Sequence, residues 1–159
     1  MGRRHDNFRD EAADLQKART RRPALTEQYV AHWSTPTRHA RLDVVTSDSL
    51  GRDEYIDVAV VHPLSAEAFQ GATAKDGSAA EREEQDKHKR YPGPFLTPAV
   101  LEVLGRPGEA AQQWLRSLHV DCPLDKRALL TQEAWQRLAC TVQRGNAAML
   151  ASAGELLAS

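Results

Sequence analysis

The sequence has few cysteines, no long apolar run and almost no net charge, and each absence excludes a class of protein. Only Cys122 and Cys140 occur among 159 residues, with no CxxC pattern, which favours free thiols in an intracellular protein, nuclear or cytoplasmic, over a disulfide framework. No apolar run approaches the roughly 20 residues of a membrane span, and the basic start is unlike a secretory signal, so no membrane partner is expected. The formal net charge of −1 gives no global attraction to nucleic acid.

Positive charge is nevertheless concentrated in three short stretches, "MGRRHDNFRD", "KARTRRP" and "DKHKRYP". Local clusters of this kind can hold phosphate groups when the total charge is near zero. Arg3, Arg4, Arg21 and Arg22 are therefore candidates for contact with a DNA backbone, although ordinary solvation explains them equally well. No histidine stands at zinc-ligand spacing from another ligand, so we expect the histidines at the surface or capping turns.

The order of the predicted elements indicates a mixed α/β domain with one small sheet flanked by helices. Two stretches stay open: "LTEQYVAHW" suits a strand or a short helix, and "PAVLEVLG" has helix-capping signals at both ends but strand-forming valines. The long C-terminal helix is expected to bend or break near Gly145. The other predicted elements are helices over 4–18, 64–71 (capped by Ser65), 79–91, 108–119 and 131–157, and strands over 40–47 and 55–63 joined by a turn at Gly51.

The second predicted strand, "YIDVAVVHP", places an acid where burial is costly. Asp57 interrupts a run of aliphatic residues, and a lone buried carboxylate costs several kcal/mol unless something compensates it. Asp43, in "RLDVV", lies on the other arm of the predicted hairpin. Two carboxylates brought together repel, and Mg²⁺ would relieve the repulsion by taking both as ligands while keeping waters and room for phosphate oxygens. The simpler alternative, two aspartates facing water or paired with arginines, is favoured from spacing alone.

A lysine on the predicted helix over 79–91 is the third candidate. Glu83, Lys87 and Tyr91 recur at i, i+4 and i+8 and so share one helix face. A lysine ammonium on that face could stabilise the charge on a scissile phosphate. Taken alone, this pattern favours a solvated face with an exposed Glu83–Lys87 pair.

Taken in order, "RLDVV", a glycine turn, "YIDVAVVHP" and "KHKRY" resemble the restriction-like endonuclease domain near the C-terminal end of non-LTR retrotransposon reverse transcriptases, a branch of the PD-(D/E)XK nucleases. In that branch an Arg-Pro-Asp strand precedes an Asp-Val-Thr-Val strand and a helix carrying a Lys-x-x-Lys-Tyr-like stretch. "GRRHDNF" is similar to the start of the family's preceding helix, and "PAVLEVLGRPG" is similar to its following strand and turn. The resemblance spans residues 3–118, with a weaker match in "WQRLACTVQRGNAAML".

The resemblance implies a restriction-endonuclease-like core over residues 1–120 and a C-terminal helical extension over 121–159, with residues 99–103 forming a strand. It implies that Asp43 and Asp57 bind Mg²⁺ or Mn²⁺. Lys87 would then be the catalytic lysine with Tyr91 beside it, while Lys89 and Arg90 join the arginines in contacting DNA. The implied activity is DNA nicking, whose 3′ hydroxyl primes reverse transcription in the family. The implied partners are DNA and a separate reverse transcriptase or RNA template.

The chain also departs from the family pattern. Leu42 stands where the family often has proline, and Ala59 stands where a lysine usually follows the second acid. Catalysis would therefore depend on Lys87, or on Lys89 if the register differs. The chain has no polymerase aspartate motif and no zinc-knuckle cysteines. A catalytically inactive nuclease-like fold that binds DNA or another protein is the alternative function. An unrelated α/β scaffold would place Asp43 and Asp57 on opposite sheet faces.

Overall fold

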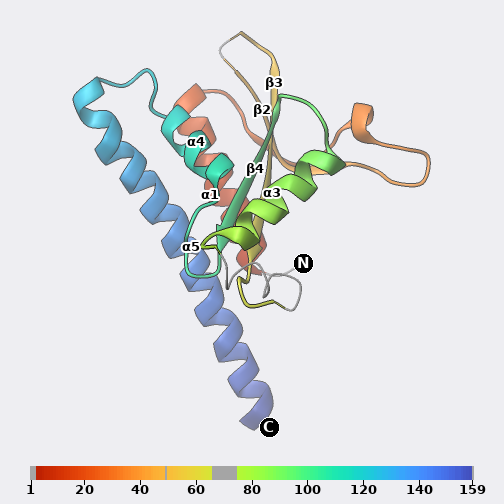
Figure 1. Ribbon diagram of the computed structural model, residues 1–159, viewed down its shortest axis with the longest axis vertical. Helices are drawn as coiled ribbons and strands as arrows, with labels where there is room; N and C mark the ends of the chain where they lie inside the picture. Colours follow the sequence, from red (N-terminus) through yellow and green to blue (C-terminus); the bar gives the residue numbers. More distant parts are fainter. Residues whose placement is uncertain (1–2, 49, 66–74, 159) are drawn as a thin grey trace.

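The computed structural model describes residues 3–48, 50–65 and 75–158 (Figure 1). The predicted helix over 64–71 lies mostly outside these ranges. One mixed sheet of four strands, in the order β1-β2-β3-β4, forms the centre of the molecule. The elements in chain order are α1 (Arg3–Thr20), β1 (Leu25–Tyr29), the 3-10 turn η1 (Ala31–Trp33), β2 (Arg41–Ser47), β3 (Asp53–Val61), α3 (Ser78–Arg90), β4 (Leu96–Glu102), α4 (Glu109–Ser117) and α5 (Leu124–Ala158).

The sheet combines an antiparallel meander with one parallel pair. β1, β2 and β3 pair antiparallel, whereas β4 pairs parallel to β3, because α3 carries the chain back along the sheet before β4 begins. The two open stretches are resolved: "LTEQYVAHW" contains both β1 and η1, and 96–102 is a strand. Pro98 is tolerated there because β4 is an edge strand, so a residue without an N–H can face outward.

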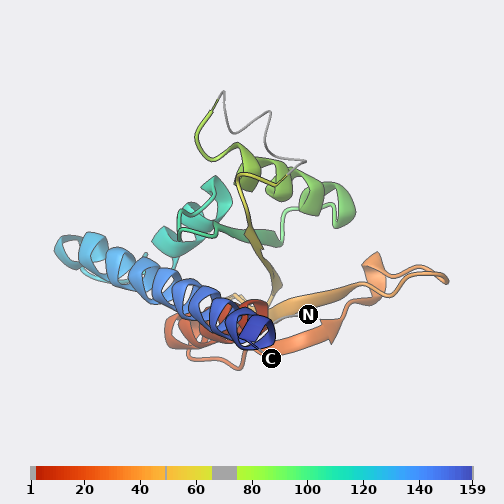
Figure 2. The same cartoon turned by 90° about the horizontal axis from the view of Figure 1, so that it is seen from below.

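Helices cover the two sides of the sheet (Figure 2). α1 packs against α5, and α3 lies on the other side of β3. Apolar residues of α1, α4, α5 and the sheet form the main core, and a smaller cluster joins β2, β3 and β4 to the residues that directly follow β1 and α3. The largest fully buried side chains of the main core are Phe8, Val44, Ile56, Val58, Leu101, Leu115, Leu138 and Val142. Of the helices within the described ranges, none has the length and apolar character needed to cross a bilayer.

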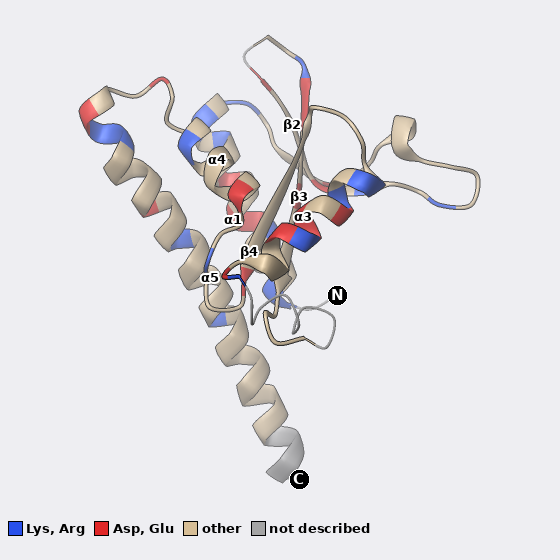
Figure 3. Ribbon diagram, viewed as in Figure 1, with Lys and Arg blue, Asp and Glu red and all other residues tan. Residues whose placement is uncertain are grey.

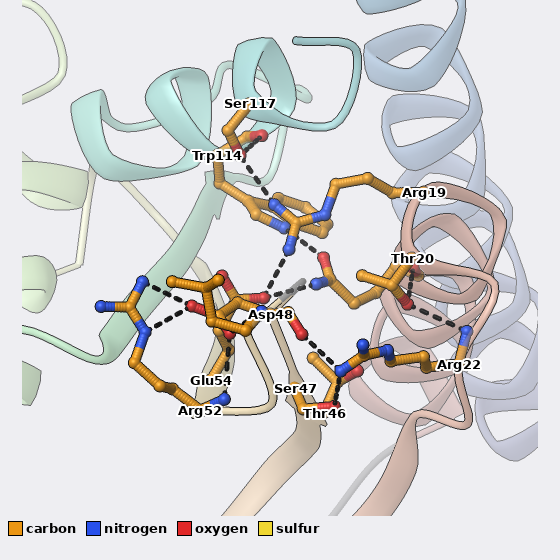
Figure 4. Close-up of polar contacts among 12 residues, drawn as sticks. Arg19, Thr20, Arg22, Thr46, Ser47, Asp48, Arg52, Glu54, Trp114 and Ser117 are labelled. Atoms are coloured by element: carbon orange, nitrogen blue, oxygen red, sulfur yellow. Dashed lines mark hydrogen bonds and ion pairs between the residues drawn. The ribbon is translucent and has the colours of Figure 1, made fainter. Parts of the chain in front are cut away.

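A polar network fastens α1 to both the sheet and α4. The Gln16 amide, 1 % exposed, donates to Glu54 on β3 at 2.9 Å and accepts from the Trp114 indole on α4 at 3.0 Å. Arg19 adds an ion pair to Glu54 at 2.5 Å and a hydrogen bond to Ser117 at 3.5 Å (Figure 4). Since these groups satisfy one another, α1 is held at a fixed angle across the sheet.

The expected interruption of the C-terminal helix is wrong. α5 begins at Leu124 and continues through Gly145 to Ala158. A Cβ atom at Gly145 would lie 2.8 Å from the Arg4 side chain, so the glycine permits the close approach of α1 rather than a kink. Arg4 also donates to the Asn146 side chain at 2.9 Å. Residues of α5 therefore belong to the main core, and the division of the chain at residue 120 stays a prediction.

Candidate active site

The site lies where β2 and β3 separate. The two strands pair from Ser47–Asp53 as far as Val44–Ile56, and the same register would place Asp43 opposite Asp57. The ladder ends there, and the Asp43 side chain replaces the next backbone partner: its Oδ2 accepts the Val58 N–H at 2.8 Å. The strands therefore open into a fork that holds both carboxylates, as the predicted hairpin required.

Lys87 enters this fork from α3 and compensates Asp57. Its Nζ lies 2.6 Å from Asp57 Oδ2 and 3.2 Å from the Val58 carbonyl oxygen. Lys87 is 5 % exposed and Asp57 is 7 % exposed. Glu83, one turn earlier, has an oxygen 3.9 Å from the same ammonium. The exposed Glu83–Lys87 pair favoured by the helix pattern is therefore wrong, because the lysine points inward.

Asp43 has a histidine as its own neighbour. His5, in the first turn of α1, places Nε2 3.3 Å from Asp43 Oδ2. This hydrogen bond raises the pKa of His5, against the opposing effect of burial. A half-buried histidine binding an acid differs from the surface role expected for the histidines, although His62 does cap a turn by accepting the Leu64 N–H at 3.1 Å.

The two carboxylates differ in proton affinity. Burial, with a smaller contribution from the nearby Asp43, raises the pKa of Asp57 to about 6, even though Lys87 favours the ionised form. For Asp43, burial opposes ionisation, but the hydrogen bond and charge of His5 outweigh it and lower the pKa. Continued by one pair, the β2–β3 register places Asp43 opposite Asp57, and opposed residues of an antiparallel pair point to the same face of the sheet, so the two carboxylates do not lie on opposite faces. Such a pair can hold one proton or one cation between them.

Tyr91 and the basic end of α3 lie apart from this fork. Tyr91, 7 % exposed, packs in an aromatic cluster, with its ring centroid 5.4 Å from that of Trp33. Lys89 is exposed and pairs with Asp86 at 3.1 Å, and Arg90 is exposed at the last turn. Of the two lysines proposed for catalysis, Lys87 is therefore the one beside the acids.

The four arginines proposed for DNA contact lie at opposite ends of α1. Arg3 and Arg4 belong to its first turn, near the fork, whereas Arg21 and Arg22 follow its last turn. An 18-residue helix separates the two pairs by about 27 Å. Arg22 donates to the Asp48 carbonyl oxygen at 2.5 Å and so fastens the β2–β3 turn. Of the four arginines, only Arg3 and Arg4 therefore lie in the same helix turn as His5 of the fork.

The fork offers two oxygen-bearing ligands, which suits Mg²⁺. That ion is commonly bound by one or two carboxylates and completes its shell with water and phosphate oxygens. The contacts of Asp43 and Asp57 given above all use Oδ2. Glu102 adds no third ligand: it pairs with Val61, about 13 Å along the sheet from Asp57. Within the described parts of the chain, no group of three or more His, Cys, Asp or Glu residues could hold a metal.

Sequence reasoning found three of the four side chains in the fork and missed His5. Its ring meets Asp43 only because α1 crosses the sheet, and a separation of 38 positions carries no spacing signal. No protein-family model and no curated protein matches this chain.

Proposed function

We propose that this chain is a Mg²⁺-dependent DNA endonuclease domain that nicks one strand, of the restriction-like type associated with retrotransposon reverse transcriptases. The observation that carries the proposal is the convergence of Asp43, Asp57 and Lys87 in one fork. Two adjacent carboxylates and a lysine are the side chains that metal-assisted phosphodiester hydrolysis needs: oxygen ligands for the ion and a compact positive charge for the phosphate.

The residues divide the work as follows. Asp43 and Asp57 would hold the ion, which supplies an activated water and stabilises the leaving oxygen. His5 keeps Asp43 ionised and oriented, because it bonds the Oδ2 atom at 3.3 Å. Lys87, whose ammonium lies in the fork, would neutralise charge that develops on the scissile phosphate. Substrate would approach past the first turn of α1, where Arg3 and Arg4 can bind the backbone.

A second candidate, a nuclease-like fold without catalysis that binds DNA or a protein, is favoured by one specific observation. Lys87 and Asp57 are 5 % and 7 % exposed and bonded to each other, and Ala59 supplies no second lysine on the strand. In an inactive domain the same pair would simply neutralise itself. The two candidates agree on the fold and differ only in whether the fork opens to a metal ion.

A plasmid-nicking assay separates them. Supercoiled DNA is incubated with the wild type in Mg²⁺ and in EDTA, and with Asp57→Asn and Asp86→Asn. Asp86 is the matched control because it is an exposed aspartate on α3 outside the fork. The endonuclease requires open-circular product in Mg²⁺ only, equal amounts from the control, and a loss of at least about 100-fold in Asp57→Asn. Nicking in EDTA, or no nicking by the wild type in Mg²⁺, would contradict the proposal.

A further inference from the structure

A groove runs between α4 and α5, on a part of the molecule that the proposed nuclease does not use. It consists of two adjoining cavities of about 480 and 630 Å³. Arg116 and Thr131 line both cavities and so mark where they meet. The first cavity extends past Trp135, and the second extends toward Val120. The two cavities therefore adjoin along the two helices, and we call them together the α4–α5 groove.

The charge of the α4–α5 groove has a single sign. Its lining contains four arginines and no aspartate or glutamate: Arg19, Arg106, Arg116 and Arg127. Arg19 and Arg106 have carboxylate partners, at 2.5 and 3.3 Å. No ion pair engages Arg116 or Arg127 among the residues that the structure describes. Figure 3 shows basic segments on α4 and near the start of α5. The groove therefore carries positive charge that the described chain does not neutralise.

Two of the side chains are held in place for binding. Arg127 donates its Nε to the Cys122 carbonyl oxygen at 2.9 Å, which fixes the plane of its guanidinium. Trp135, 42 % exposed, donates its Nε1 to the Gly105 carbonyl oxygen at 2.9 Å. The edge of the indole is thus anchored, and part of its surface remains open to the groove. An oriented aromatic ring beside arginines is the arrangement that binds unstacked bases and their phosphates.

We infer that the α4–α5 groove binds a single strand of nucleic acid, with Arg116 and Arg127 on phosphates and Trp135 stacked on a base. The neighbouring cavity between α1 and α5 shows why the assignment is specific to this groove. That cavity includes Asp121 and Glu133 beside its arginines, of which Arg19 and Arg137 are paired with carboxylates, so it attracts a phosphate chain less. The inference does not depend on cleavage, because these residues lie outside the fork.

An acidic peptide is the competing occupant, and the lining fits it less well. A docked peptide helix needs a row of apolar anchor sites one helical turn apart. The exposed large apolar side chains of the groove are Trp135, at one end, and Val120, at the other, with arginines between them. The lining of the groove therefore matches the phosphates and one base of a nucleic acid better than it matches the continuous apolar face of a peptide helix.

Fluorescence anisotropy with a fluorescein-labelled dT20 oligonucleotide tests the inference. The wild type, Arg116→Gln/Arg127→Gln and the control Lys17→Gln/Arg144→Gln are titrated between 50 and 200 mM salt. The control removes the same charge from exposed sites outside the groove. We expect the groove variant to bind about tenfold more weakly and its log–log salt dependence to flatten by about 1.4, or roughly 0.7 per lost phosphate contact. Equal binding by the two variants would overturn the assignment.

Two further measurements test whether Trp135 stacks on a base and whether the groove prefers nucleic acid to an acidic protein. Trp135→Ala should weaken dT20 binding about tenfold, whereas Trp135→Phe, which keeps a ring but loses the bond to Gly105, should bind nearly as the wild type does. Equal losses in both would refute stacking. Poly-L-glutamate at matched charge should displace dT20 poorly; efficient displacement would assign the groove to an acidic protein. Asp57→Asn should leave dT20 binding unchanged, so failure of nicking and failure of groove binding are distinguishable.

Discussion

Replacing Lys87 by Met tests whether a buried ammonium is what stabilises Asp57. With the lysine in place, burial raises the pKa of Asp57 from 3.8 to about 6, a cost of about 3 kcal/mol for keeping the carboxylate ionised. Without Lys87, the opposite charge 2.6 Å away is lost while the burial remains. We expect Lys87→Met to lower the free energy of unfolding at pH 7.5 by about 3–5 kcal/mol, the range for breaking a buried pair on one side.

A double-mutant cycle in urea distinguishes this charge effect from lost packing. Asp57→Val leaves the Lys87 ammonium buried without its partner and should lower the free energy of unfolding by a similar amount. The double variant Asp57→Val/Lys87→Met removes both charges. The double variant should recover at least about 2 kcal/mol relative to the sum of the single losses. The reasoning would be refuted if the two single losses simply added, or if Lys87→Met cost less than about 1 kcal/mol.

The pH dependence of the same variants carries a definite sign. Asp57 binds its proton more tightly in the folded than in the unfolded state, so its contribution to stability is present below pH 3.8 and is lost as the pH rises through about 6. Removing Lys87 raises the folded pKa further, which extends this loss to higher pH. The difference between wild type and Lys87→Met should therefore be largest above pH 7 and should fall below about 1 kcal/mol near pH 4.

Two other predictions concern α1 and α5. The pKa of His5 is raised by its hydrogen bond to Asp43, so the free energy of unfolding of the wild type should exceed that of His5→Ala most below pH 6, and the difference should shrink toward pH 8. An NMR titration of Asp43→Asn should show a lower His5 pKa than the wild type, and an unchanged pKa would contradict the contact. Gly145→Ala should lower the free energy of unfolding by about 1–3 kcal/mol because its Cβ meets Arg4 at 2.8 Å, whereas Gly154→Ala, with nothing within 4 Å, should raise it by up to about 1 kcal/mol; a stabilising Gly145→Ala would argue against the tight α1–α5 contact.

The sequence was most informative where periodicity and charge act locally. The hairpin arms around Gly51 and the helix carrying Lys87 were predictable because alternation of apolar residues and helix propensity act within a few positions. The prediction for α5 is wrong at Gly145, because a glycine's low helix propensity indicates a break in a long helix, whereas here its missing Cβ permits the close approach of α1. A close contact between two segments that are distant in the sequence does not alter the local periodicity of either segment.

The candidate site divides in the same way. Asp43 and Asp57 could be found from the hairpin, since a short turn brings its arms together. That Lys87 points inward could not be found from its helix, because a run of charged residues indicates a solvated face, and only the acid beneath it makes burial tolerable. His5 and the α4–α5 groove depend on how α1, α4 and α5 pack on the sheet, which no single segment specifies.

The early end of the β2–β3 ladder has a consequence for how this fold could change. Val58 gives its N–H to Asp43 and its C=O to Lys87, so two charged side chains occupy the positions of ordinary rungs and act as a wedge between the strands. If Asp43 and Lys87 were both replaced by aliphatic residues, we expect the β2–β3 hairpin to form further backbone hydrogen bonds beyond Val44–Ile56. The protein would become more stable, but the fork between β2 and β3, which is the candidate active site, would close.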